Sequence, residues 1–196
     1  MSYEEYLALP DESRIIEWVD GEAIFYMPAS TSHQKLVLLL ALLLGFYVNK
    51  FRLGQIMVAP YEVKLWPGGP SREPDVLFIG QDRLGSLSRQ RFDGGPNLVI
   101  EIISPASVTT DRVNKFREYE RAGVNEYWII DPRSQQQQAD FYVRDERGLF
   151  VPAAIGEGGV YSSAAIPGFR LRLDWLWEPE EVDTEGALAW ILGSQG

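Results

Sequence analysis

The chain of 196 residues carries a formal net charge of −10 and contains no cysteine. The lack of cysteine excludes a disulfide framework, a thiolate zinc site and a cysteine nucleophile. The negative charge argues against nonspecific affinity for nucleic acid, so any nucleic-acid function needs a local basic patch, a metal ion or a partner.

The N-terminal segment, residues 1–14, is acidic and has no apolar stretch, unlike a secretory signal. Together with the lack of cysteine, this predicts a cytoplasmic protein. The one long apolar run, residues 36–48, is shorter than the roughly 20 residues that span a membrane, so we expect a buried core helix and no membrane. No linker divides the chain, which predicts a single domain over residues 1–196.

The first half of the chain alternates short strands with one long helix. A short helix is predicted over residues 3–9, and the Asp20-Gly21 turn predicts a hairpin between strands at 14–19 and 22–26. Residues 31–50 read as the long helix, capped by one of three hydroxyl residues at 30–32. We expect a strand over 55–66, in which Pro60 indicates an edge or a bulge, and a short strand over 75–79 after a loop.

In the second half, residues 80–95 are polar and predict a surface loop with a helical turn. Residues 98–103 form an apolar strand typical of the middle of a sheet. A helix follows over 109–122, with Thr109 or Thr110 as its cap and Gly123 at its end, and then a strand over 126–130. The remainder is predicted to be β-like, with a hairpin between 139–144 and 149–152.

Glu101 is out of place, because it lies inside an apolar strand. The period of two puts it on one strand face with Val99 and Ile103. Asp75 begins the preceding strand, and if the two strands are neighbours the two carboxylates converge. Two convergent carboxylates repel unless a positive charge lies between them, and a hard divalent cation such as Mg²⁺ is the natural partner.

The helix after the Glu101 strand carries three residues at a spacing of four, so they share one helix face: Asp111, Lys115 and Tyr119. The strand–helix–strand order around Glu101 predicts a parallel strand pair with a right-handed crossover. A lysine that reaches the carboxylates from this helix would orient a water molecule or neutralise a phosphate as a point charge.

These residues resemble the Uma-two family of restriction-endonuclease-like proteins in the PD-(D/E)XK nuclease superfamily. The resemblance covers about residue 3 to about residue 175, and it rests on Glu22, His33, Pro74-Asp75, the EIIS run from Glu101 to Ser104, Asp111, Lys115, Tyr119 and EYWIIDP at 126–132. It implies an α/β (α+β) fold with a restriction-endonuclease-like core, in which helices flank a mixed central sheet and further β-hairpins are added.

The resemblance also implies the site and its chemistry. Asp75 and Glu101 would bind Mg²⁺ or Mn²⁺, the backbone carbonyl of Ile102 would be a further ligand, and the substrate would be DNA. Nuclease relatives carry a lysine two residues after the acid, where this chain has Ile103. The resemblance implies that Lys115 supplies the missing amine, so the predicted catalytic residues are Asp75, Glu101 and Lys115. Lys64 is a second candidate, because its strand precedes that of Asp75.

Several alternatives stay open from the sequence. The chain is either a metal-dependent DNA endonuclease or an inactive nuclease-fold module for binding or assembly, and Glu101 with Lys115 is alternatively a purely structural ion pair. His33 is either a solvent-exposed or capping residue or a neighbour of the metal, and Glu22 is either a surface acid or a further acid of the site.

The tryptophans near the C-terminus, Trp175 and Trp177, are candidates for a subunit contact and predict a homodimer. The same two side chains would serve equally well to close the core.

Overall fold

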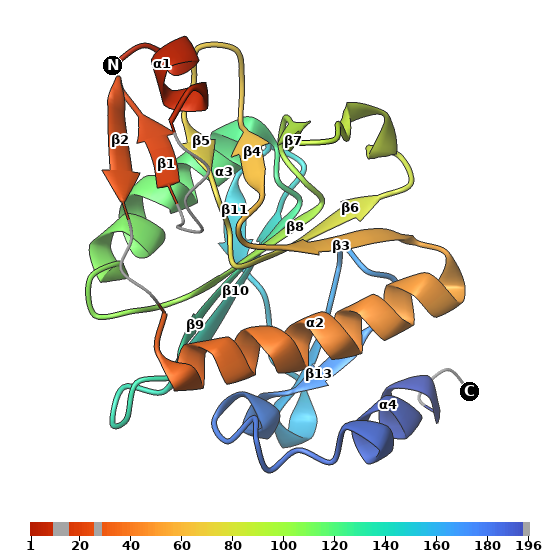
Figure 1. Cartoon of the computed structure of the whole chain (residues 1–196). Helices are drawn as coiled ribbons and strands as arrows, with labels where there is room; N and C mark the ends of the chain where they lie inside the picture. The colour runs from red at the N-terminus through yellow and green to blue at the C-terminus, as the bar shows by residue number, and fades with distance from the viewer. Residues whose placement is uncertain (10–15, 26–28, 194–196) are drawn as a thin grey trace.

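A computed structural model describes residues 1–9, 16–25 and 29–193 of the chain. Its centre is a six-stranded mixed sheet, with α2 and α4 below it and α3 and a smaller sheet above it in Figure 1. The strand order is β11-β10-β9-β8-β6-β3. The strands are Gly54–Val58 (β3), Val76–Gly80 (β6), Leu98–Ile102 (β8), Glu126–Asp131 (β9), Gln138–Arg144 (β10) and Phe150–Pro152 (β11). The predicted α/β architecture, a mixed sheet flanked by helices, is confirmed.

The smaller sheets stand on either side of this centre. The five-stranded sheet has the order β2-β1-β5-β4-β7, and β12 pairs with β13. Their strands are Ile16–Val19 (β1), Glu22–Phe25 (β2), Glu62–Lys64 (β4), Ser71–Arg72 (β5), Arg91–Asp93 (β7), Val160–Ser162 (β12) and Arg170–Arg172 (β13). The predicted hairpin at Asp20-Gly21 is confirmed by the β1–β2 pair, whereas residues 14, 15 and 26 of the expected strands lie outside the described residues.

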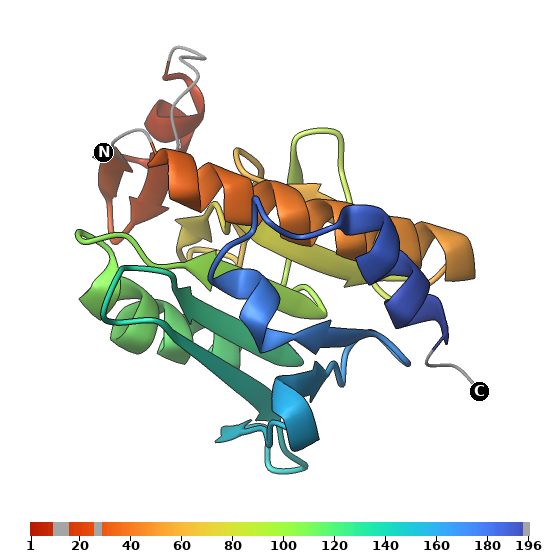
Figure 2. The ribbon, with the colours of Figure 1, turned by 90° about the horizontal axis from the view of Figure 1, so that it is seen from below.

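The helices cover the two faces of the six-stranded sheet. The α-helices are Tyr3–Leu7 (α1), Thr31–Phe51 (α2), Phe116–Ala122 (α3) and Thr184–Gly193 (α4), and a π-helical segment, Thr110–Lys115, leads into α3. Short 3₁₀ turns occur at Leu84–Ser86, Glu157–Gly159 and Leu173–Leu176. Seen from below in Figure 2, α4 lies beside the C-terminal half of α2.

Helix α2 is the predicted core helix. The side chain of Ser30 caps it by accepting a hydrogen bond from the backbone N–H of His33 at 3.2 Å. Its inner face, which includes Leu36, Leu40 and Leu43, packs on the sheet without exposure to solvent. By length and composition alone α2 is also long and apolar enough for a membrane span, but its buried face is that of a core helix.

The alternation predicted for β6 and β8 is confirmed. Val99 and Ile103 pack with Leu77 in the core layer above the six-stranded sheet, while the intervening residues of both strands pack below it against α2. Strand β8 is antiparallel to β6 and parallel to β9, as the strand–helix–strand order requires. Glu101 therefore points to the side that carries α3.

Four local expectations were wrong. The strand expected over 55–66 is two strands in different sheets, β3 and β4, because Pro60 lacks the N–H that would continue a ladder. The loop expected over 80–95 contains β7, which pairs with β4. The helix expected over 109–122 is present over 110–122 and ends at Gly123 as predicted, but its first part is a π-helix and Thr109 makes no capping hydrogen bond with its side chain. The C-terminal part is not wholly β-like, since it contains α4.

Candidate metal and catalytic site

The two predicted acids lie on neighbouring strands at one end of the central sheet. Asp75 immediately precedes β6, whose first residue, Val76, pairs with Ile100 of β8, so Asp75 is placed beside Glu101. Both side chains are buried. Their charges interact, since the carboxylate of Asp75 is one of the groups that raise the pKa of Glu101. The structure thus brings together the pair that the strand pattern predicted.

Asp75 is held from two directions. Its Oδ2 accepts a hydrogen bond from the backbone N–H of Ile102 at 2.7 Å, and the same oxygen lies 3.2 Å from Nε2 of His33. His33 is therefore buried in the site rather than exposed. Burial opposes the charged imidazolium, but hydrogen bonding and the charge of Asp75, helped by the backbone of Ile102, raise the pKa of His33 above its usual value.

Glu101 is held by the helix that follows it. Its Oε1 accepts a hydrogen bond from the Tyr119 hydroxyl at 2.7 Å and lies 3.0 Å from Nζ of Lys115. The same Nζ is 3.2 Å from Oε1 of Glu17 and 3.3 Å from Oδ1 of Asp111. Three carboxylates therefore share one buried ammonium group.

This arrangement leaves an excess of negative charge in the protein interior. Burial raises the pKa of Glu101 well above its usual range, Lys115 acts against this, and Asp111, Asp75 and Glu17 add to it. Burial would lower the pKa of Lys115, but the surrounding carboxylates raise it well above its usual value. The lysine thus stays charged. It does not by itself neutralise the acids around it, and Arg72, which pairs with Glu17, supplies a second buried positive charge.

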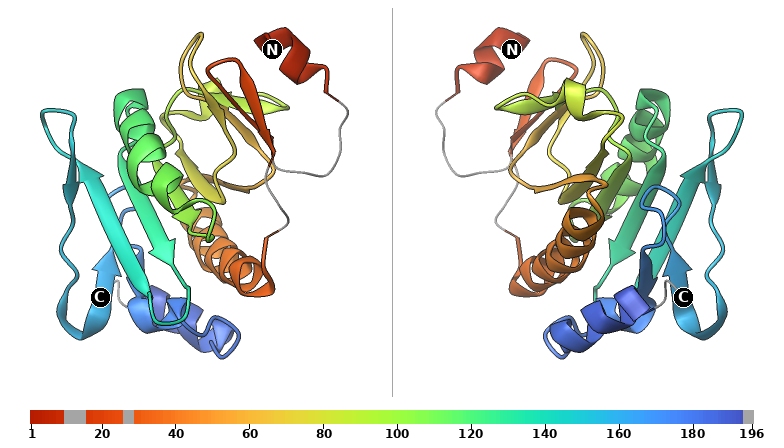
Figure 3. Two further views of the ribbon diagram at one scale, coloured as in Figure 1. Left: turned by 90° about the vertical axis from the view of Figure 1, so that its left-hand side faces the viewer. Right: turned by 90° about the vertical axis from the view of Figure 1, so that its right-hand side faces the viewer.

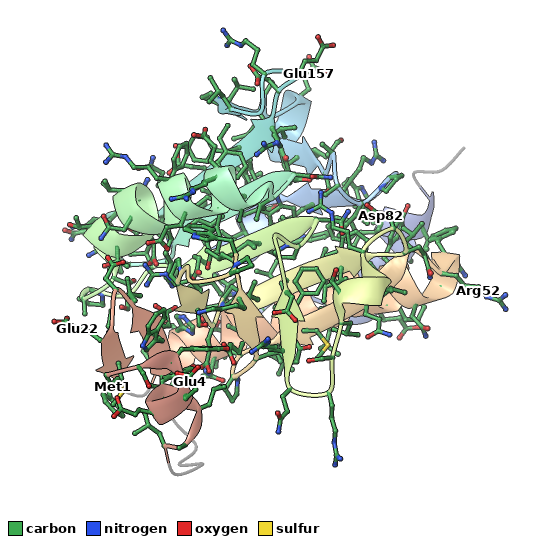
Figure 4. All side chains as sticks on the ribbon, turned by 90° about the horizontal axis from the view of Figure 1, so that it is seen from above. Met1, Glu4, Glu22, Arg52, Asp82 and Glu157 are labelled. Atoms are coloured by element: carbon green, nitrogen blue, oxygen red, sulfur yellow. The ribbon has the colours of Figure 1, made fainter. Side chains whose placement is uncertain are left out.

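Glu17 was missed by the sequence reasoning. It lies in β1, and it bridges Lys115 to Arg72, whose Nη1 is 2.7 Å from Oε2 of Glu17. The signal was nonetheless present, because Glu17 lies between Ile16 and Trp18 in a short apolar strand, as Glu101 does in its own strand. Glu22, the early acid named by the family resemblance, is exposed on β2 and points outward (Figure 4).

The π-helical segment positions the lysine. Asp111 and Lys115 are both buried within it. The predicted common face with Tyr119 is confirmed, because Lys115 and Tyr119 contact Glu101 and Asp111 contacts Lys115. A π-helical turn contains more residues than an α-helical one and is frequently found at functional sites. Here the wide turn places Lys115 against Glu101 of β8 and Asp111 against Lys115.

Lys64 does not reach the carboxylates. Its Nζ donates a hydrogen bond to the carbonyl oxygen of Gly69 at 2.6 Å and lies over the rings of Tyr3 and Trp18. Ile103, which occupies the usual lysine position, is buried in the apolar layer. Among the lysines considered, the structure therefore brings Lys115 to Glu101 and leaves Lys64 outside the site.

The donor set fits a hard divalent cation. Asp75, Glu101 and the backbone of Ile102 offer oxygen atoms, which Mg²⁺ and Mn²⁺ prefer over nitrogen or sulfur. Within residues 1–9, 16–25 and 29–193, no three Asp, Glu or His side chains form a ready metal-binding group. A cation here would rely on two carboxylates, a carbonyl and water, as Mg²⁺ sites commonly do.

Comparison with known proteins defines the class of fold first. The structure superposes with a TM-score of 0.74 on a solved protein described as "a putative nuclease belonging to DUF820 from Anabaena variabilis ATCC 29413", at 18% identity over 91% of this chain and 98% of that one. At this identity the likeness shows a shared fold.

The family follows from the sequence profile. The profile of the Uma2 (Uma-two) family, described as "Putative restriction endonuclease", matches residues 3–174. The chain belongs to this family. No curated protein matches the chain.

Two buried groups near Asp75 predict a fall in stability as pH rises: His33, and Glu73, whose carboxylate accepts a hydrogen bond from the backbone N–H of Ile16 at 3.3 Å. Burial raises the pKa of Glu73 to about 7 in the folded protein, so unfolding between pH 4.5 and 7 releases a proton. The pKa of His33 is also raised, so its contribution is complete below about pH 6.5 and is lost above the folded pKa. We expect urea midpoints, measured with a chelator present, to decrease from pH 4.5 into the alkaline range.

Two variants separate these contributions. Glu73→Gln should make the decrease in the urea midpoint smaller below about pH 7. His33→Gln should make the decrease smaller at higher pH. Glu146→Gln makes the same chemical change at an exposed position and should leave the profile unaltered. A wild-type midpoint that rises with pH over this range would contradict the prediction.

Proposed function

We propose that the chain is a divalent-metal-dependent endonuclease that hydrolyses the phosphodiester bonds of DNA. The observation that carries this proposal is the buried pair Asp75 and Glu101 on neighbouring strands, with the Lys115 ammonium 3.0 Å from Glu101. Membership of the Uma2 family and the nuclease-like fold support it.

Each residue of the site would have a separate role in the reaction. Asp75, Glu101 and the carbonyl of Ile102 would hold Mg²⁺ or Mn²⁺, which when bound polarises a phosphoryl oxygen and makes a bound water more acidic. His33 and the Ile102 N–H fix Oδ2 of Asp75. Lys115 would orient the attacking water or stabilise charge on the phosphate.

A cation in this position would also reduce the electrostatic repulsion between this acidic chain and DNA. A chain with a formal charge of −10 repels a polyanion, and the carboxylates of the site add to that repulsion locally. A divalent cation between them would attract the phosphate at the point of reaction. We therefore expect binding of DNA to depend on the metal.

Cleavage assays test the proposal. Wild-type protein should cut plasmid or single-stranded DNA with Mg²⁺ or Mn²⁺ and not with a chelator, and Glu101→Gln should abolish cutting because it removes a metal-binding charge. Glu146→Gln is the control, since it removes one exposed acid far from these contacts. No metal-dependent cutting by the wild type, or equal cutting by Glu101→Gln, would refute the proposal.

A second candidate is an inactive nuclease-fold module that binds or assembles. Ile103 at the usual lysine position and the occupation of Lys115 by three carboxylates favour it. Calorimetric titration with Mn²⁺ bears on this alternative. Binding that Asp75→Asn abolishes, without any cleavage, would identify a retained metal site in a module. No binding at all would leave Glu101 and Lys115 as a structural ion pair.

The cytoplasm remains the proposed compartment, because the chain has no cysteine. Cell fractionation that finds the protein outside the cytoplasm would contradict this expectation.

A further inference from the structure

An apolar stripe lies on the outer face of α2. Leu38, Leu42 and Phe46 are spaced by four residues and are 61%, 48% and 47% exposed. They lie on the opposite side of the helix from Leu36 and Leu40, which are fully buried. Three exposed apolar side chains in line on one helix face are a candidate contact surface. Figure 3 shows α2 at the outer edge of the molecule.

The stripe also leaves room for a second helix to approach α2 closely. Gly45 lies beside Phe46 on α2, and a Cβ atom added to it would meet no atom within 4 Å. Glycine in the interior of a helix costs roughly 1 kcal/mol relative to alanine. Among the described residues no neighbour requires glycine here, whereas a second helix packed on the stripe would benefit from the missing side chain.

The two ends of the stripe differ in charge. At the C-terminal end are Lys50 and Arg52, and Arg52 projects away from the helix in Figure 4. At the N-terminal end Glu180 lies 3.0 Å from Lys35 and, with Glu178 and Glu181, lines an acidic hollow of about 360 Å³.

We propose that a second copy of this chain packs on the stripe, with the two α2 helices antiparallel and the two-fold axis near Leu42. Phe46 then faces Leu38 of the partner subunit, and Lys50 and Arg52 reach the partner's acidic hollow. A parallel arrangement would place the like-charged ends together, so charge complementarity selects the antiparallel one. The contact is isologous, as a two-fold dimer requires.

This surface differs from the one suggested by the C-terminal tryptophans. Trp175 packs edge-on against Trp190 of α4, with ring centroids 5.4 Å apart, and Trp177 packs on the core. Because His33 lies at the N-terminus of α2, the antiparallel dimer places its two candidate sites at opposite ends of the helix pair. The inference does not depend on the proposed nuclease activity.

Analytical ultracentrifugation of the full chain tests the interface. The wild type should sediment with twice the mass of one chain, and Leu42→Asp should weaken association by at least about 30-fold, as expected for a central contact. Gly45→Gln, which has free space within one chain, should weaken it as well. Leu149→Asp is the control, because Leu149 is a similarly exposed leucine, at 45%, in the β10–β11 turn.

Charge reversal tests the antiparallel register. Lys50→Glu with Arg52→Glu should weaken the dimer, as should Glu178→Lys with Glu181→Lys, and the four changes together should restore it. A wild-type monomer at every concentration, a dimer that survives Leu42→Asp, or no restoration would overturn the proposal. So would a monomer that floats with phosphatidylcholine–phosphatidylglycerol vesicles, because a lipid surface would then be the occupant of the stripe.

Discussion

Replacing Lys115 with methionine is expected to lower the free energy of unfolding by roughly 3–5 kcal/mol, the usual cost of removing one partner from a buried ion pair. Methionine keeps most of the volume but leaves Glu17, Glu101 and Asp111 without their shared ammonium. Urea or guanidinium denaturation at neutral pH measures the change. The variant should also be inactive if Lys115 serves the reaction.

Two further variants test whether the loss of stability comes from removing the buried ammonium group. Lys35→Met removes an ion pair whose side chains are 44% and 45% exposed, so it should cost no more than about 1 kcal/mol. Adding Glu101→Gln to Lys115→Met should recover part of the loss, because one buried charge then disappears with its partner. A Lys115→Met protein as stable as Lys35→Met would show that the buried cluster is not held by this ammonium.

Replacing His33 with methionine is expected to weaken Mn²⁺ binding about 10–100-fold, the usual effect of removing a group that orients a metal ligand. Nε2 of His33 lies 3.2 Å from Oδ2 of Asp75, on the oxygen that Ile102 also binds. His33→Gln retains an N–H donor at a similar reach and should keep most of the affinity. Calorimetric titration of the three proteins measures this difference, which a purely space-filling role would not produce.

The imidazole signal gives an independent check, because His33 is the single histidine of the chain. Its NMR resonances should shift with Mg²⁺ and broaden with paramagnetic Mn²⁺ in the wild type, and neither change should occur in Asp75→Asn. Metal binding that leaves the imidazole signal unchanged would place the metal elsewhere. Equal affinities for the methionine and glutamine variants would remove the orienting role while leaving the proposed metal site intact.

Much of the central sheet was predictable, because its signals are local. The alternation of side chains in β8 assigned Glu101 to the face that carries α3, and there it contacts Lys115 and Tyr119. Asp75, just before β6, instead contacts the backbone of Ile102 and the side chain of His33 of α2. The hairpins at β1–β2 and β10–β11 followed from turn residues. At Pro60, where a proline interrupts the alternation, no local signal indicates which sheet the following residues join.

The C-terminal part of the fold was harder to predict from the sequence, because it too lacks a clear local pattern. Helix α4 is apolar on several sides, with Ala187 and Ile191 buried and Trp190 packed against Trp175. A helix that is covered by its neighbours lacks a clear apolar stripe, so its pattern does not distinguish it from strand. Packing against α2 decides its conformation.

By itself, the sequence determined that Glu101 is a buried acid that requires partners, since this follows from residue type and a period of two. It placed Asp75 near Glu101 only on the condition that their strands are neighbours, and the pairing of β6 with β8 in the tertiary structure met that condition. Only the tertiary structure decided that Glu17 and His33 complete the cluster and that Glu22 and Lys64 do not. The physical reason is distance along the chain. The contacts of β1 and α2 with Lys115 and Asp75 arise from packing between segments far apart in sequence, and no local pattern encodes which acid or histidine that packing brings to the site.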